Sequence, residues 1–171
     1  MKVAILAMQL LALASASPQK KPSSVALKPF EFRGFVAGQE MTPEQAATCH
    51  KSGMTTFCGP DDDRVAGVRV LSSYVSAENN RMVRIGISAD PIYFGIITDA
   101  FKKKYGPPCL SSVEKWVSQT GIKRQNPVFT WCFKTGKLKA KMYGSTLDVS
   151  EIDYADVSEA PMKKPEPKID F

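Results

Sequence analysis

The sequence is poor in the groups that acid–base catalysis at neutral pH needs. It contains one histidine, His50, and histidine is the side chain that normally titrates in this range. The P-loop, the G-x-S-x-G turn of serine hydrolases, the H-E-x-x-H zinc helix and the dinucleotide-binding glycine motif are all missing. The sequence therefore does not predict an enzyme, and a small hydrolase would need a carboxylate pair assembled only by folding.

An apolar run long enough to span a bilayer, about 20 residues, is also missing. The apolar stretch at 3–13 is interrupted only by Gln9, follows Lys2 and precedes small residues at 14–16. This order is typical of a secretory signal peptide with its cleavage site. We predict that residues 1–16 are removed and that a soluble chain without an integral membrane span reaches the periplasm or the medium.

Two stretches of the mature chain have few apolar residues. Residues 17–28 and 158–171 are rich in Pro, Lys, Ser and Glu, and we expect both to be disordered. The predicted folded part is a single domain at 29–157, with no internal repeat. Loss of Lys2 with the signal peptide leaves 22 basic and 17 acidic residues, a formal charge of +5. This charge favours solubility and a mild attraction to anionic surfaces.

Two segments carry helix-start signals. The T-P-E-Q motif at 42–45 combines a capping box with proline at the first helical position, and predicts a helix that ends at Gly53. An acidic N-cap and a proline at 90–91 predict a second helix. Its apolar stripe extends to Tyr105, and Gly106 is expected to end it.

The other predicted elements are strands. They are a short strand at 30–32, hairpins formed by 68–75 with 82–87 and by 128–133 with 138–143, and a closing strand at 152–157. Residues 113–118 fit either a strand or a short helix. Val83, Ile85 and Ile87 share one face and are predicted to point into the core. We therefore predict an α+β fold in which two helices pack on a mostly antiparallel sheet of five or six strands.

The cysteines of an exported chain are expected to be oxidised. Four cysteines allow two disulfides in three connectivities, and we favour Cys49–Cys58 and Cys109–Cys132. His50 is adjacent to a cysteine, which is awkward for chelation, and the two close ligand pairs of a zinc site are missing. We expect neither a metal nor a cofactor, and we expect His50 to be an exposed helix residue.

The main candidate contact surface is a strand rich in lysine. Lys137, Lys139 and Lys141 alternate with apolar residues, which is typical of a half-exposed strand. The same row of lysines is also a candidate site for an anionic polymer. Trp116 is either a core residue or part of an aromatic surface for a partner, since tryptophan is favoured at interface hot spots.

Several blocks resemble small exported proteins of Gram-negative bacteria: residues 30–34, the paired Cys49 and Cys58, residues 99–108 and residues 131–138. The likeness covers about 30–157 and implies an exported location and a fold, but no activity. The chain is also similar to small periplasmic modules that bind other envelope proteins, although it lacks the lipid-anchoring cysteine of the lipoproteins among them. We predict a disulfide-stabilised, non-enzymatic binding module acting on another envelope protein as adaptor or inhibitor. The alternative is a binder of envelope glycan, lipid headgroups or nucleic acid through the lysine strand.

Overall fold

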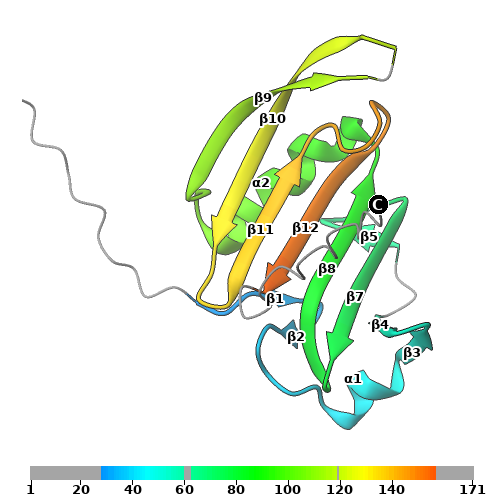
Figure 1. The fold of residues 1–171 in the computed structure, drawn as a ribbon. Helices are drawn as coiled ribbons and strands as arrows, with labels where there is room; N and C mark the ends of the chain where they lie inside the picture. The colour runs from blue at the N-terminus through cyan, green and yellow to red at the C-terminus, as the bar shows by residue number, and fades with distance from the viewer. Residues whose placement is uncertain (1–27, 60–62, 119, 157–171) are drawn as a thin grey trace, which may run out of the picture.

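The computed structural model describes residues 28–59, 63–118 and 120–156 (Figure 1). Within these ranges the chain is mostly β-structure, with one eight-stranded antiparallel sheet and two two-stranded sheets. The signal peptide predicted at 1–16, all but Lys28 of the segment predicted at 17–28, and the predicted tail at 158–171 lie outside the described residues.

The main sheet has the spatial order β3-β4-β7-β8-β12-β11-β10-β9. In that order its strands are β3 (Cys49–Ser52), β4 (Thr55–Cys58), β7 (Ser72–Glu78), β8 (Arg81–Ala89), β12 (Ser150–Asp156), β11 (Gly136–Lys141), β10 (Lys123–Cys132) and β9 (Leu110–Val117). The small sheets pair β1 (Glu31–Phe32) with β2 (Phe35–Val36) and β5 (Arg64–Val65) with β6 (Val68–Arg69). The helices are α1 (Pro43–Ala47), the 3-10 turn η1 (Pro91–Tyr93) and α2 (Phe94–Tyr105).

The predicted α+β fold, with two helices packed on five or six strands, is wrong. The sheet has eight strands, and α1 is a five-residue helix that buries none of its residues. The extra strands come from two places. Residues 49–58 form the hairpin β3–β4, where the end of a helix and a loop were expected, and residues 110–117 form a full strand, β9. The described residues therefore form a mostly β fold, and among their helices only α2 buries side chains against the sheet.

The first helix is shorter than predicted because a hairpin competes for its second half. The capping box is confirmed: the Gln45 N–H donates to Thr42 Oγ1 at 3.3 Å, and the Thr42 N–H donates to Gln45 Oε1 at 2.9 Å. Gly53 has the expected positive φ, 62°, but it is the first of two turn residues between the paired Ser52 and Thr55. The β-branched and aromatic residues at 55–57 favour a strand, and glycine permits the tight turn. His50 consequently lies on β3.

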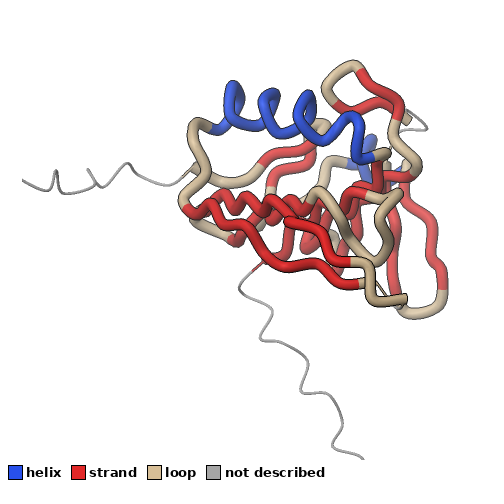
Figure 2. Tube along the Cα trace, turned by 90° about the horizontal axis from the view of Figure 1, so that it is seen from above, coloured by secondary structure: helices blue, strands red, loops and turns tan. Residues whose placement is uncertain are grey.

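One face of the sheet carries the core. The helix α2 crosses this face behind β10, β11 and β12, on its way from the end of β8 to the outer strand β9 (Figures 1 and 2). Its residue Phe94 stacks on Phe129 at 5.9 Å, and Phe101 meets Trp131 edge-on at 5.8 Å. The side chains buried beneath are alternate residues of the central strands, such as Leu138, Ala140, Ile152 and Tyr154.

The predicted core face of β8 is right only in part. Ile85 and Ile87 are buried, but Val83 is half-buried and Met82 takes its place in the core. The register shifts here, because Ser76 pairs with Arg84 whereas the next residue, Ala77, pairs with Met82. Val83 is therefore the extra residue of a β-bulge, and a bulge reverses the alternation of faces beyond it.

The N-terminal segment is held by an aromatic cluster over the sheet. Phe30 stacks on Tyr154 with 4.3 Å between ring centroids, and also contacts Tyr105 and Phe133. The Tyr154 hydroxyl lies 2.8 Å from Thr135 Oγ1. Burial raises the pKa of Tyr154 to about 12, although the hydrogen bond to Thr135 acts in the opposite direction.

The raised pKa of Tyr154 predicts that the folded state loses stability in alkali. An unfolded tyrosine ionises near pH 10, but Tyr154 in the folded state keeps its proton to about pH 12. Its contribution is therefore complete below about pH 10, and declines by roughly 1.4 kcal/mol per pH unit between the two values. In urea unfolding from pH 9 upward, the free energy of unfolding should fall less steeply with pH for Tyr154→Phe than for the parent. At neutral pH the variant should be less stable by about 1 kcal/mol, because it lacks the hydrogen bond to Thr135. Equal slopes for the two proteins would contradict this account.

Candidate binding surface

The three lysines predicted as a contact surface lie together on the face of the sheet opposite α2. Gly136, Leu138 and Ala140 of β11 are buried, whereas Lys137 is exposed and Lys139 and Lys141 are half-buried. The predicted alternation is therefore confirmed. We call this side the open face. Its outward side chains include Glu114 and Trp116 of β9, the three lysines of β11, Glu151 and Asp153 of β12, Arg84 of β8 and Tyr74 of β7.

Two of the three lysines have carboxylates beside them, and Lys139 has one on each side. On β12, Asp153 pairs with Lys139 and Glu151 pairs with Lys141. On the β9 side, Lys139 Nζ lies 3.3 Å from Glu114 Oε1, in an ion pair whose two side chains are partly exposed. The basic row therefore lies between two acidic positions, and the field it projects into solvent is reduced.

A fourth basic residue lies on the open face beyond β12. Arg84 is exposed on β8, next to Ala155 in the ladder. Although Asp153 is exposed, partial desolvation by the surrounding strands raises its pKa, and the neighbouring Glu151 carboxylate adds to the shift. Lys141 and Arg84 lower the same pKa. The open face thus carries rows of alternating charge rather than one sign.

Trp116 contributes to this face but is already partnered. Its indole N–H donates to the Gly144 carbonyl at 2.9 Å, and its ring centroid lies 6.2 Å from that of Tyr143. Trp116 therefore has a structural role, because its side chain ties β9 to the loop between β11 and β12. The half-buried ring still borders the open face.

The other end of the open face is also aromatic. Phe57 of β4 meets Tyr74 edge-on at 5.5 Å, and His50 lies 6.1 Å from Phe57. Gly86 leaves the room that Tyr74 needs, because a Cβ at that position would come within 2.3 Å of the tyrosine ring. His50 is exposed, as predicted, although on a strand rather than a helix.

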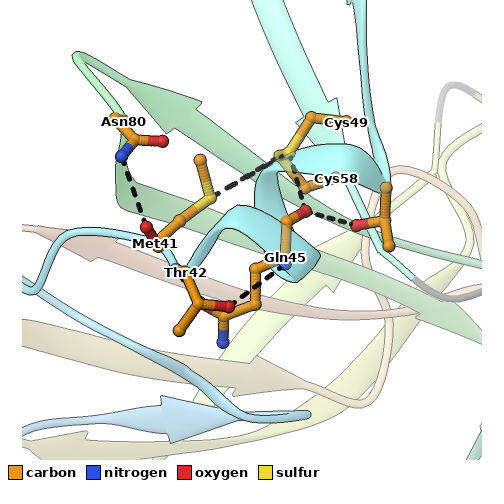
Figure 3. The surroundings of a disulfide bond; sticks show 7 residues. Met41, Thr42, Gln45, Cys49, Cys58 and Asn80 are labelled. Atoms are coloured by element: carbon orange, nitrogen blue, oxygen red, sulfur yellow. Dashed lines mark hydrogen bonds between the residues drawn. A yellow bond between two sulfur atoms is a disulfide. The ribbon is translucent and has the colours of Figure 1, made fainter.

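Both predicted disulfides are confirmed. Cys49 and Cys58 face each other across the hairpin β3–β4, and Cys109 joins Cys132. Figure 3 shows the first disulfide next to Met41, whose sulfur lies 4.0 Å from Cys49 Sγ and 3.9 Å from Cys58 Sγ. The part of the chain that the structure describes contains no group of three or more His, Cys, Asp or Glu residues suited to a metal ion.

Sequence reasoning missed the acidic rows. The S-E-I-D-Y-A-D sequence at 150–156 alternates as clearly as the lysine strand, so Glu151 and Asp153 could have been placed on an exposed face. Their position beside the lysines could not have been found in this way, because it depends on β12 lying between β8 and β11. For residues 113–118 the sequence left a strand and a short helix open, and the structure shows the strand β9. A hollow of about 510 Å³ lined by residues 113–115 and 123–125 was not expected.

None of the helices that the structure describes is long and apolar enough to cross a membrane. Comparison of the chain with protein-family models, with curated proteins and with solved structures gives no match.

Proposed function

We propose that the protein is an exported, disulfide-stabilised binding module that contacts another envelope protein through the open face of its sheet, as an adaptor or an inhibitor. The observation that carries this proposal is the placement of Lys137, Lys139 and Lys141 between the carboxylates of Glu114 and those of Glu151 and Asp153. Rows of both signs suit the mixed charges of a folded protein surface, and complementary charge rows set the register of such a contact.

The same observation disfavours the polyanion alternative. A glycan sulfate, phosphate headgroup or nucleic acid backbone laid along β11 would approach the three lysines and also Glu151 and Asp153 on the neighbouring strand. Repulsion from these carboxylates offsets part of the attraction, and Lys139 already has a counterion, Glu114, within the protein. A partner that carries both signs meets no such conflict.

Two further features support the proposal. Disulfides persist in oxidising compartments, in agreement with export through the signal peptide predicted at 1–16. The aromatic pairs at the two ends of the open face, Trp116 with Tyr143 and Phe57 with Tyr74, add the residue types that are enriched at protein interfaces.

Removal of the acidic row distinguishes the two functions by the sign of its effect. In the double variant Glu151→Gln/Asp153→Gln, a protein partner loses one row of complementary charge, and we expect its affinity to fall by about tenfold. A polyanion would lose only repulsion, so its affinity would rise and its salt dependence would steepen. The partner is first identified by cross-linking in the periplasm, and binding is then measured with the purified pair and, separately, with heparin.

The matched control is Glu40→Gln/Glu44→Gln, which removes two carboxylates outside the main sheet and should leave partner affinity unchanged. Tighter heparin binding by the Glu151→Gln/Asp153→Gln variant, with unchanged affinity for the protein partner, would replace the proposal by its alternative.

A further inference from the structure

The outer strand β9 is a long sheet edge, and half of its eight residues are apolar. Every residue of β9 except Trp116 is exposed, and the exposed fractions of Leu110, Val113 and Val117 are 61, 64 and 50%. Among the described residues no strand pairs with the outer side of β9. The opposite edge, β3, is only four residues long and polar. Natural sheets normally shorten, charge or cover such an edge, because its free backbone groups recruit another strand.

The free backbone groups of β9 belong to its odd-numbered residues. The Ser118 N–H donates to the Ile122 carbonyl at 2.9 Å, one step beyond the pair formed by Val117 and Lys123. In an antiparallel ladder, hydrogen-bonded pairs alternate with pairs whose N–H and C=O groups point away. Counting back from Ser118, the outward groups are those of Ser111, Val113, Lys115 and Val117.

We propose that β9 pairs with β9 of a second copy of this chain, antiparallel and centred on Val113. A two-fold axis perpendicular to the sheet keeps the faces of the two copies on the same sides, so that residues of the same parity pair. In this register Val113 meets Val113, Ser112 meets Glu114, Ser111 meets Lys115 and Leu110 meets Trp116. Two kinds of pair result: apolar residues face apolar residues, and each serine faces a charged residue. No like charges face each other.

The neighbouring registers are poorer. Centring the pair on Glu114 opposes two carboxylates, and centring it on Lys115 opposes two ammonium groups. A register centred on Ser112 shortens the overlap within β9 to residues 110–114 and leaves Trp116 without its apolar counterpart. The charge pattern of β9 therefore selects Val113 as the centre, and a second copy satisfies the edge better than a strand of arbitrary sequence.

The dimer would join two eight-stranded sheets into one, with both α2 helices on one side and both open faces on the other. The β9 edge and the open face are separate surfaces. The dimer consequently presents two copies of the proposed partner surface side by side, and its failure would leave the proposed function of a single copy untouched.

Sedimentation velocity over a wide range of concentration should show a reversible monomer–dimer equilibrium for the mature protein. Val113→Lys places two like charges at the centre of the pair, and we expect it to raise the dimer dissociation constant by at least about tenfold. The substitution is at an exposed site, so circular dichroism and the melting temperature should stay close to those of the parent. Ile92→Lys, at a position that is 75% exposed outside β9, is the matched control and should dimerise normally.

Cysteine cross-linking tests the register. The four native cysteines are paired, so Val113→Cys adds the single free thiol. In the proposed pair its Cα lies about 5.5 Å from its counterpart, within the range of a disulfide, and mild oxidation should give a covalent dimer. Glu114→Cys is displaced by two residues from its counterpart, about 7–8 Å away, and should remain uncrosslinked. A monomer at all concentrations, or cross-linking of Glu114→Cys in place of Val113→Cys, would overturn the proposal.

Discussion

Replacement of Trp131 by alanine should lower the free energy of unfolding by about 3–5 kcal/mol, the range observed for large aromatic side chains removed from cores. Trp131 is 2% exposed, and its ring meets Phe101 of α2 edge-on and lies 6.2 Å from Phe129. Its indole N–H donates to the Gly106 carbonyl at 2.9 Å, which fixes the end of α2 over the sheet. The substitution opens a cavity and also leaves this carbonyl without its partner.

The second tryptophan provides the matched control. Trp116 makes a hydrogen bond of the same length, to Gly144, but its ring is only half-buried at the edge of the sheet. We expect Trp116→Ala to cost about 1–2 kcal/mol, from the smaller buried area and the lost hydrogen bond. Urea unfolding followed by far-ultraviolet circular dichroism gives both values. Equal losses for the two variants would show that α2 is not anchored through Trp131 as described.

Removal of the Cys109–Cys132 disulfide should lower the free energy of unfolding by about 3.4 kcal/mol, because it frees a loop with a sequence separation of 23 in the unfolded chain. This disulfide joins the residue that precedes β9 to the last residue of β10, close to the point where the chain leaves α2. Cys109→Ala/Cys132→Ala tests the prediction without leaving free thiols. The same chain-entropy argument gives about 2.6 kcal/mol for Cys49–Cys58, with a separation of 9.

The two disulfide variants check each other. Cys49 and Cys58 already face one another in the register of a local hairpin, and we expect Cys49→Ala/Cys58→Ala to be the milder double variant. Urea unfolding should show a smaller loss for Cys49→Ala/Cys58→Ala than for Cys109→Ala/Cys132→Ala. The parent, measured before and after reduction, gives the loss when both disulfides are broken. A larger loss for Cys49→Ala/Cys58→Ala would mean that the hairpin β3–β4 depends on its disulfide more than the loop length indicates.

Local signals in the sequence determined a large part of this protein. The capping box at Thr42, the acidic N-cap at Asp90, the glycine end of α2 and the alternation of Gly136–Lys141 each involve residues within a few positions of one another. Both disulfide pairings were also favoured from the sequence, because each joins cysteines close to a predicted turn or helix end. Such features follow from backbone geometry, propensity and short loop closure, which depend little on the rest of the chain.

Only the tertiary structure decided the neighbours of each strand. Alternation within each strand places Lys139 and Asp153 on an exposed face. They are neighbours only because β12 lies between β8 and β11. The paired strands β8 and β12 begin over 60 residues apart in the chain. The bulge at Val83 and the exposed position of β9 depend on which strands pair and in which register, and residue propensities do not specify either. The hairpin that ends α1 early is a local one, and it competes with the helix signal of the same segment. The sequence alone thus determined the alternation of the lysine strand, whereas the strand order decided that carboxylates lie beside its lysines and that β9 is an edge.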